Sequence, residues 1–173
     1  MSLDTMPAAD GLPCPAPLEL AEQLVLWMWR ELHAERAQPS PALVAGLRLA
    51  FGLAGVERAL AAVLALWRCY DGHRRRPASV AAHRTRSVSA EERLLIGLIA
   101  TAQQGAEAHH AAIVLRLVRG GGAEAVVEAA RELAILLARS GFRLPCRIRD
   151  LPADRMARNG QDGWSLASSS VRH

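Results

Sequence analysis

The chain has 173 residues, of which 51% are hydrophobic and 4% aromatic, and its formal net charge is +4. This length and apolar content suit one folded domain with tails and exclude a chain that is disordered throughout. The 21 lysine-plus-arginine positions are all arginine, and alanine and leucine fill much of the remainder. Because alanine and leucine are strong helix formers and β-branched residues are sparse, the composition predicts an all-α protein. Arginine and alanine are also what GC-rich codons supply, so the basic charge alone does not indicate an acidic partner.

Residues 1–16 are rich in proline and are expected to form a flexible leader. A first helix is predicted over about 17–37. Its middle is apolar nearly all round, with Trp27 and Trp29 on opposite sides. A helix of this kind lies at the centre of a bundle or at an interface. We therefore expect Trp27 and Trp29 to contribute to a partner-binding surface.

A second helix is predicted over about 41–70, with Ser40 as its N-cap and Asp71-Gly72 as its stop. Large side chains recur four and three residues apart along it, which is typical of a core-facing stripe or a dimer seam. The charges of Glu57 and Arg58 near its middle argue against a membrane span. The stripe comprises Leu49, Leu53, Val56, Leu60, Val63, Trp67 and Tyr70.

Residues 71–88 form a basic linker, and Pro77 bars a continuous helix through it. Runs of charge are often only solvated, whereas clustered arginines also bind phosphates or an acidic protein face. Two interpretations therefore stay open, a solvated loop and a nucleic-acid-binding or anion-binding site. The arginines concerned are Arg74, Arg75, Arg76, Arg84 and Arg86.

Ser89 and Glu92 form a capping box that opens a third helix, and its apolar line continues to residue 119. Gln103-Gln104-Gly105 either bends this helix or divides it. A last helix is predicted over about 123–140 and is stopped by Gly141. Residues 17–141 are thus expected to form an antiparallel bundle of about four helices.

Beyond the bundle, residues 142–151 alternate apolar and polar side chains, as a short edge strand or an extended basic segment does. Arg143, Arg147 and Arg149 lie on this segment, which could bind a partner by adding a strand to a sheet edge. Residues 152–173 are expected to be a disordered tail. Within that tail Trp164 is a candidate docking anchor.

One motif has metal-ligand chemistry. Glu107 and His110 form a Glu-x-x-His motif, the spacing that supplies iron or manganese ligands in di-iron four-helix bundles. Such a site needs two of these motifs, and this chain has one, so a homodimer would have to supply the second. The alternative interpretation is that His110 lies at the edge of the core while Glu107 faces solvent.

The sequence favours a protein that is not an enzyme. It has no Gly-x-Ser-x-Gly motif, and Cys14, Cys69 and Cys146 form no Cys-x-x-Cys pair, which suits a reducing cytoplasm. We expect no cofactor and no membrane association. The leading hypothesis is a bacterial cytoplasmic adaptor or regulator that binds a protein partner or a second copy of itself. The alternatives are a nucleic-acid-binding regulator that uses residues 74–86 and a di-iron or manganese protein completed by dimerisation.

Overall fold

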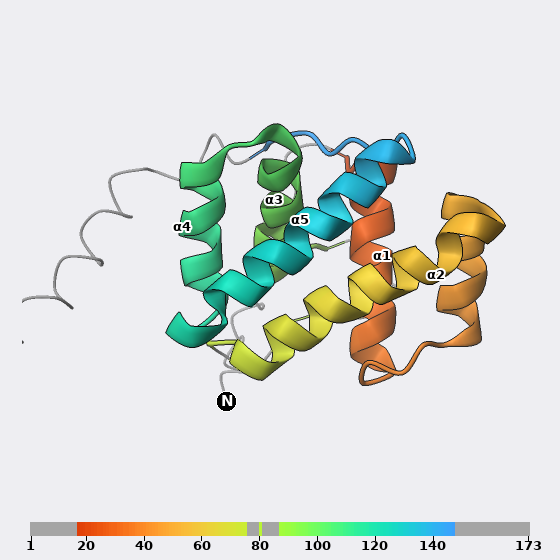
Figure 1. The fold of residues 1–173 in the computed structure, drawn as a ribbon, viewed down its shortest axis with the longest axis horizontal. Coiled ribbons are helices and arrows are strands. Elements are labelled where there is room, and N and C mark those ends of the chain that lie inside the picture. The colour runs from red at the N-terminus through yellow and green to blue at the C-terminus, as the bar shows by residue number, and fades with distance from the viewer. Residues whose placement is uncertain (1–16, 76–79, 81–86, 148–173) are drawn as a thin grey trace, which may run out of the picture.

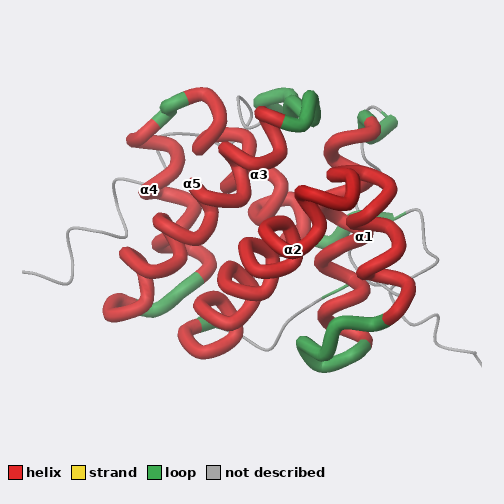
Figure 2. Tube along the Cα trace, turned by 45° about the vertical axis from the view of Figure 1, so that its right-hand side comes forward, coloured by secondary structure: helices red, strands yellow, loops and turns green. Residues whose placement is uncertain are grey.

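The computed structural model describes residues 17–75, 80 and 87–147, and these form five α-helices and one turn of 3-10 helix. The expectation of an all-α protein is confirmed, because no described residue belongs to a strand (Figure 2). The leader expected over 1–16 and the tail expected over 152–173 lie outside the described residues. The elements are α1 (Leu20–Ala34), α2 (Pro41–His73), α3 (Ala90–Gln104), α4 (Glu107–Leu117), η1 (Gly120–Gly122) and α5 (Ala123–Arg139).

The predicted antiparallel bundle of about four helices is not confirmed, because the described residues form five α-helices. In Figure 1, α5 and the later part of α2 lie side by side and cross obliquely over the other helices. Helix α3 packs on α4 and α5, while α1 packs on α2 and α3. Two local features cause the departure: the segment 89–119 is divided into α3 and α4, and α2 is bent.

Local capping explains where α2 and α3 begin and where α3 ends. The Ser40 hydroxyl accepts the Leu43 amide at 3.0 Å, as predicted. In the capping box of α3, the Glu92 carboxylate accepts the Ser89 amide at 2.7 Å and the Ser89 hydroxyl accepts the Glu92 amide at 3.1 Å. Gly105 adopts φ 66° and ψ 25°, the left-handed conformation that ends a helix. Gly105 and Ala106 therefore separate α3 from α4.

Helix α2 is bent at Gly52, which has φ 71° and ψ 176° within an otherwise helical run. This backbone region is essentially restricted to glycine. We call residues 41–51 the first arm of α2 and residues 53–73 its second arm. The predicted continuous stripe was wrong at its start, because Leu49 and Leu53 are 89% and 69% exposed. The helix also continues through Asp71-Gly72 to His73, so the predicted stop was wrong as well.

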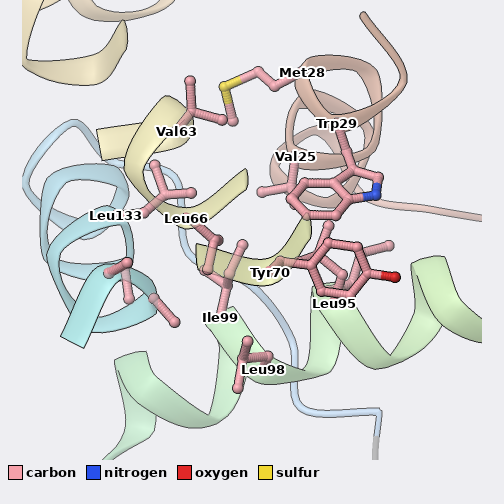
Figure 3. Packing of buried hydrophobic residues seen from close by; sticks show 14 of the residues in the cluster. Val25, Met28, Trp29, Val63, Leu66, Tyr70, Leu95, Leu98, Ile99 and Leu133 are labelled. Carbon is pink, nitrogen blue, oxygen red and sulfur yellow. The ribbon is translucent and has the colours of Figure 1, made fainter. Parts of the chain in front are cut away.

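The core lies where α1, the second arm of α2, α3 and α5 meet, as Figure 3 shows. Trp29 of α1 meets Tyr70 of α2 edge to face, with ring centroids 5.0 Å apart and planes at 65°. This aromatic pair adds to the burial energy of its neighbours and fixes α1 against α2. The labelled side chains around the pair are Val25, Met28, Val63, Leu66, Leu95, Leu98, Ile99 and Leu133.

Candidate functional site

Three of the six exposed large hydrophobic side chains in the described part of the chain lie close to the bend in α2. Val44, Leu49 and Leu53 are 37%, 89% and 69% exposed and lie close to one another on this helix. They line a shallow, open hollow in which the one charged side chain among the described lining residues is Arg48. We call this region the α2 corner surface; its residues are Pro39, Pro41, Val44, Ala45, Arg48, Leu49, Gly52 and Leu53.

The first arm of α2 has two apolar faces, and only one of them is covered. Leu43 and Leu47 are fully buried, and the Trp27 ring lies so close to Gly46 that an added Cβ would overlap it. Val44 and Leu49, on the other face, are exposed. Exposed apolar surface costs roughly 25 cal/mol per Å² relative to its burial. A contiguous apolar region of this kind is a candidate contact surface for another protein.

The two tryptophans proposed as partner-binding residues occupy different places. Trp29 is 2% exposed and belongs to the core. Trp27 is half-buried and covers Gly46 on the first arm of α2. Both side chains are therefore used to hold α1 against α2, and the surface that remains open lies on α2. Trp164 falls outside the described residues.

The beginning of the basic linker is fixed to the end of α4. Arg74 and Val118 form an isolated antiparallel bridge. The Arg75 amide donates to the Leu117 carbonyl oxygen at 3.1 Å, and the Arg119 amide donates to that of His73 at 2.8 Å. This pairing brings Arg74, Arg75 and Arg119 to one corner of the molecule. We call these three residues the arginine corner.

The arginines of the arginine corner also make hydrogen bonds and an ion pair within the chain. The Arg75 Nε donates to the Val118 carbonyl oxygen at 2.8 Å, and one Nη of Arg119 donates to the Arg75 carbonyl oxygen at 3.2 Å. Arg74 lies 3.3 Å from the Asp71 carboxylate. The arginines also follow the carboxyl ends of α2 and α4, where a helix dipole stabilises cations. Arg76, Arg84 and Arg86 lie outside the described residues.

The described part of the predicted extended segment, residues 142–147, belongs to no helix and no strand. It is held by the Gln103 side chain, whose amide nitrogen donates to the Phe142 carbonyl oxygen at 2.9 Å. The Gln103 amide oxygen accepts the Leu144 amide at 2.9 Å. A side-chain amide thus provides the donor and acceptor that a neighbouring strand would supply.

The three arginines of this segment are placed differently. Arg147 binds the Glu22 carboxylate through two nitrogens, at 2.8 and 2.9 Å, so it ties the segment to α1. Glu22 is 1% exposed, and Arg147 shields its charge at the surface. Arg143 is exposed, and Arg149 lies outside the described residues. Arg147 therefore has a structural contact that accounts for its position.

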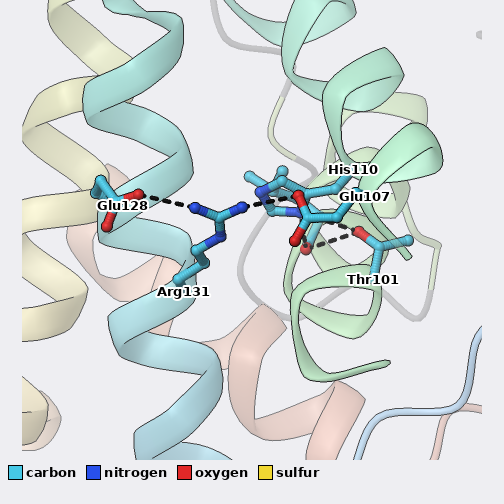
Figure 4. Close-up of polar contacts among 6 residues, drawn as sticks. Thr101, Glu107, His110, Glu128 and Arg131 are labelled. Atoms are coloured by element: carbon cyan, nitrogen blue, oxygen red, sulfur yellow. Dashed lines mark hydrogen bonds and ion pairs between the residues drawn. The ribbon is translucent and has the colours of Figure 1, made fainter. Parts of the chain in front are cut away.

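The Glu-x-x-His motif is divided between solvent and core. Glu107 is 70% exposed and pairs with Arg131 at 2.7 Å, and Arg131 also pairs with Glu128 at 2.9 Å (Figure 4). His110 is 3% exposed. No group of three or more His, Cys, Asp or Glu side chains that could hold a metal occurs among the described residues. The two side chains therefore lie as the alternative interpretation predicts, with His110 buried and Glu107 exposed to solvent.

The buried ring of His110 joins α4 to α3. Its Nδ1 donates to the Leu98 carbonyl oxygen at 3.1 Å and lies 3.2 Å from the Thr101 hydroxyl. Nε2 is then the unprotonated ring nitrogen, and it is buried with no hydrogen-bond partner among the described residues. Burial lowers the pKa of His110 below its usual 6.5, and the nearby charge of Arg131 lowers this pKa further. The hydrogen bond to the Leu98 carbonyl raises the pKa, but by less than burial lowers it. His110 is therefore neutral in the folded protein near pH 7.

An ion pair with both side chains buried was not expected from the sequence. Arg30 of α1 and Glu92 of α3 are 6% and 0% exposed, with Arg30 Nε 2.7 Å and Nη2 3.1 Å from the carboxylate oxygens. Arg30 also donates to the Ser87 carbonyl oxygen at 2.7 Å. The available signal was the position of Arg30 at the end of an apolar run in α1. The pair fixes α1 relative to α3.

By length and composition, α2 is the one helix in the described part of the chain that could cross a membrane, and 22% of its most apolar window is buried. A single helix of this kind is weak evidence, since core helices meet the same criteria. No family model, no curated protein and no solved structure matches the chain. Any proposal about its function therefore rests on the geometry of its surfaces.

Proposed function

We propose that this chain is a protein-interaction module of the bacterial cytoplasm and that the α2 corner surface is its binding site. The observation that carries the proposal is the joint exposure of Val44, Leu49 and Leu53 along one face of α2. A shallow apolar face with a single charge suits an apolar protein segment, whose burial would provide the binding energy. As an adaptor or regulator, the module acts by binding and has no catalytic step.

Site-specific photocrosslinking in living cells tests this function. A photoreactive amino acid at Leu49 should give discrete crosslinked protein species. The same amino acid at Leu115 of α4, an exposed leucine (57%) outside the α2 corner surface, is the matched control. Adding Leu53→Asp should abolish the Leu49 adducts, because a charge would have to be buried on binding. No adducts at Leu49, or the same adducts at Leu115, would refute the proposal.

The arginine corner supports a second candidate function, binding of nucleic acid. We infer this from the pairing that gathers Arg74, Arg75 and Arg119 at one place. Fluorescence anisotropy with duplex DNA over a salt series provides the test. Arg74→Gln with Arg119→Gln should weaken binding and reduce the salt slope by about one for each lost phosphate contact. Arg139→Gln, at the far end of α5, is the control; equal losses in both variants would remove this candidate.

A further inference from the structure

The bend in α2 is made by a single residue. Gly52 interrupts a 33-residue helix with φ 71° and ψ 176°, and the residues on either side of it are helical. A built Cβ on Gly52 would meet no atom within 4 Å, so the space around it does not require glycine. The backbone conformation does, because side chains are essentially excluded from it. Gly52 is therefore a one-residue hinge with a simple alternative, which is to become helical.

The hinge separates two parts of the protein that hold each other through side chains. Residues 17–51 form a hairpin of α1 and the first arm of α2, which we call the N-terminal hairpin. It contacts the rest of the chain through Trp29 on Tyr70 and through the Arg30–Glu92 ion pair. At the bend, the Phe51 ring lies 5.7 Å from that of Phe142. All of these contacts join segments on opposite sides of Gly52.

A straight α2 would carry the N-terminal hairpin away from its own chain and leave both surfaces uncovered. A second copy in the same straight form has the matching surfaces. Reciprocal exchange would then rebuild the contacts of Trp29 and Arg30 between chains, with the same partners. Short hinges between packed elements favour this kind of exchange, which is a low-cost route to a dimer.

We propose that the partner of the α2 corner surface is a second copy of this chain, which exchanges its N-terminal hairpin by straightening α2 at Gly52. This rests on the proposed function, since it names the occupant of that surface. In the exchanged dimer the two hinge regions run close to the twofold axis. Leu49 and Leu53 of one chain then lie beside those of the other. The straight helix also aligns these residues with Val56 and Leu60, as the sequence pattern predicts.

Substitution of the hinge glycine gives the first test. Gly52→Ala raises the free energy of the bent form, because a side chain strains this backbone conformation, and lowers that of the straight helix, because alanine favours helix. Both effects occur in each chain of the dimer. The expected shift toward dimer is at least about 30-fold per chain, from the cost of a side chain in this backbone region and the helix propensity of alanine. Gly72→Ala is the matched control: Gly72 lies in the same helix, with open space around its Cα and no positive φ. Light scattering coupled to size-exclusion chromatography measures the molar mass and so distinguishes monomer from dimer.

The second test asks which chain Trp29 contacts and needs no substitution. Equal amounts of ¹³C-labelled and unlabelled wild-type chains are refolded together from urea, and the dimer fraction is isolated. Isotope-filtered nuclear Overhauser effects between the rings of Trp29 and Tyr70 arise across chains only if the N-terminal hairpin is exchanged. We expect these cross-chain signals in the wild-type dimer and, if Gly52→Ala folds, in its dimer as well.

The outcomes separate the exchange from the proposed function. Cross-chain Trp29–Tyr70 signals support the exchange. A dimer in which the Trp29–Tyr70 signals stay within one chain overturns the exchange. The two chains then associate through their surfaces and each keeps its own N-terminal hairpin. A wild-type chain and a Gly52→Ala variant that are both monomeric at micromolar concentration also overturn the exchange. If Leu49 still captures a different protein in cells, the proposed function stands although the exchange has failed. If Leu49 captures nothing, both fail.

Discussion

Replacing Glu92 with alanine should destabilise the protein more than any change to its exposed ion pairs. Glu92 is fully buried, binds Arg30 through two oxygens and accepts the Ser89 amide in the capping box of α3. Glu92→Ala leaves the Arg30 guanidinium, 6% exposed, without its carboxylate. Removing one partner of a buried pair costs about 3–5 kcal/mol, and loss of the cap is part of that cost.

Urea denaturation followed by circular dichroism measures this free energy of unfolding. Glu128→Ala is the control, because Glu128 is 64% exposed and its pair with Arg131 lies at the surface. Such surface pairs contribute about 0–1 kcal/mol. Replacing both Arg30 and Glu92 with methionine should cost only about 1–2 kcal/mol, chiefly from the capping box, because no unpaired charge stays buried. If Glu92→Ala costs no more than Glu128→Ala, the inference that this pair fixes α1 against α3 is wrong.

Three further predictions concern local contacts. Burial lowers the pKa of His110 below 6.5, so the unfolded chain takes up the proton first. The stability contributed by neutral His110 should therefore be present above pH 6.5 and decrease as the pH falls below it, and His110→Gln should flatten that decrease in urea titrations from pH 7.5 to 5. Gln103→Ala removes the acceptor of the Leu144 amide, and hydrogen exchange should show faster exchange at Leu144 with helix amides unchanged. Gly46→Ala places a methyl group against Trp27 and should cost about 1–3 kcal/mol in thermal unfolding, whereas an unchanged melting temperature would show that the Trp27 ring moves freely.

Much of the helical content could be predicted because its causes are local. The Ser40 cap and the Ser89–Glu92 capping box depend on residues three apart and form as expected. Gly105 ends α3 because glycine alone adopts the left-handed conformation at little cost. The sequence could identify the break at Gln103–Gly105 but could not decide between a bent helix and two helices. That choice depends on whether His110 can reach Leu98 and Thr101, which is a tertiary contact.

Most of the candidate site could not be predicted from the sequence. Leu49 and Leu53 share a periodic stripe with Val63 and Tyr70, and periodicity alone assigns all four to one buried face. The structure buries the last two and exposes the first two, because Gly52 turns the first arm of α2 onto α1. The partner-binding role expected for Trp27 and Trp29 was predicted without knowledge of this bend, which packs the first arm of α2 on α1.

The sequence by itself determined the all-α class and the helix starts at Ser40 and Ser89. These follow from propensity and capping, which act within a few residues. Tertiary structure alone decided the bend at Gly52, the burial of Arg30 with Glu92 and the exposure of the α2 corner surface. The physical reason is that a glycine permits two conformations and an arginine permits two environments. Only the packing of segments far apart in the chain selects between them.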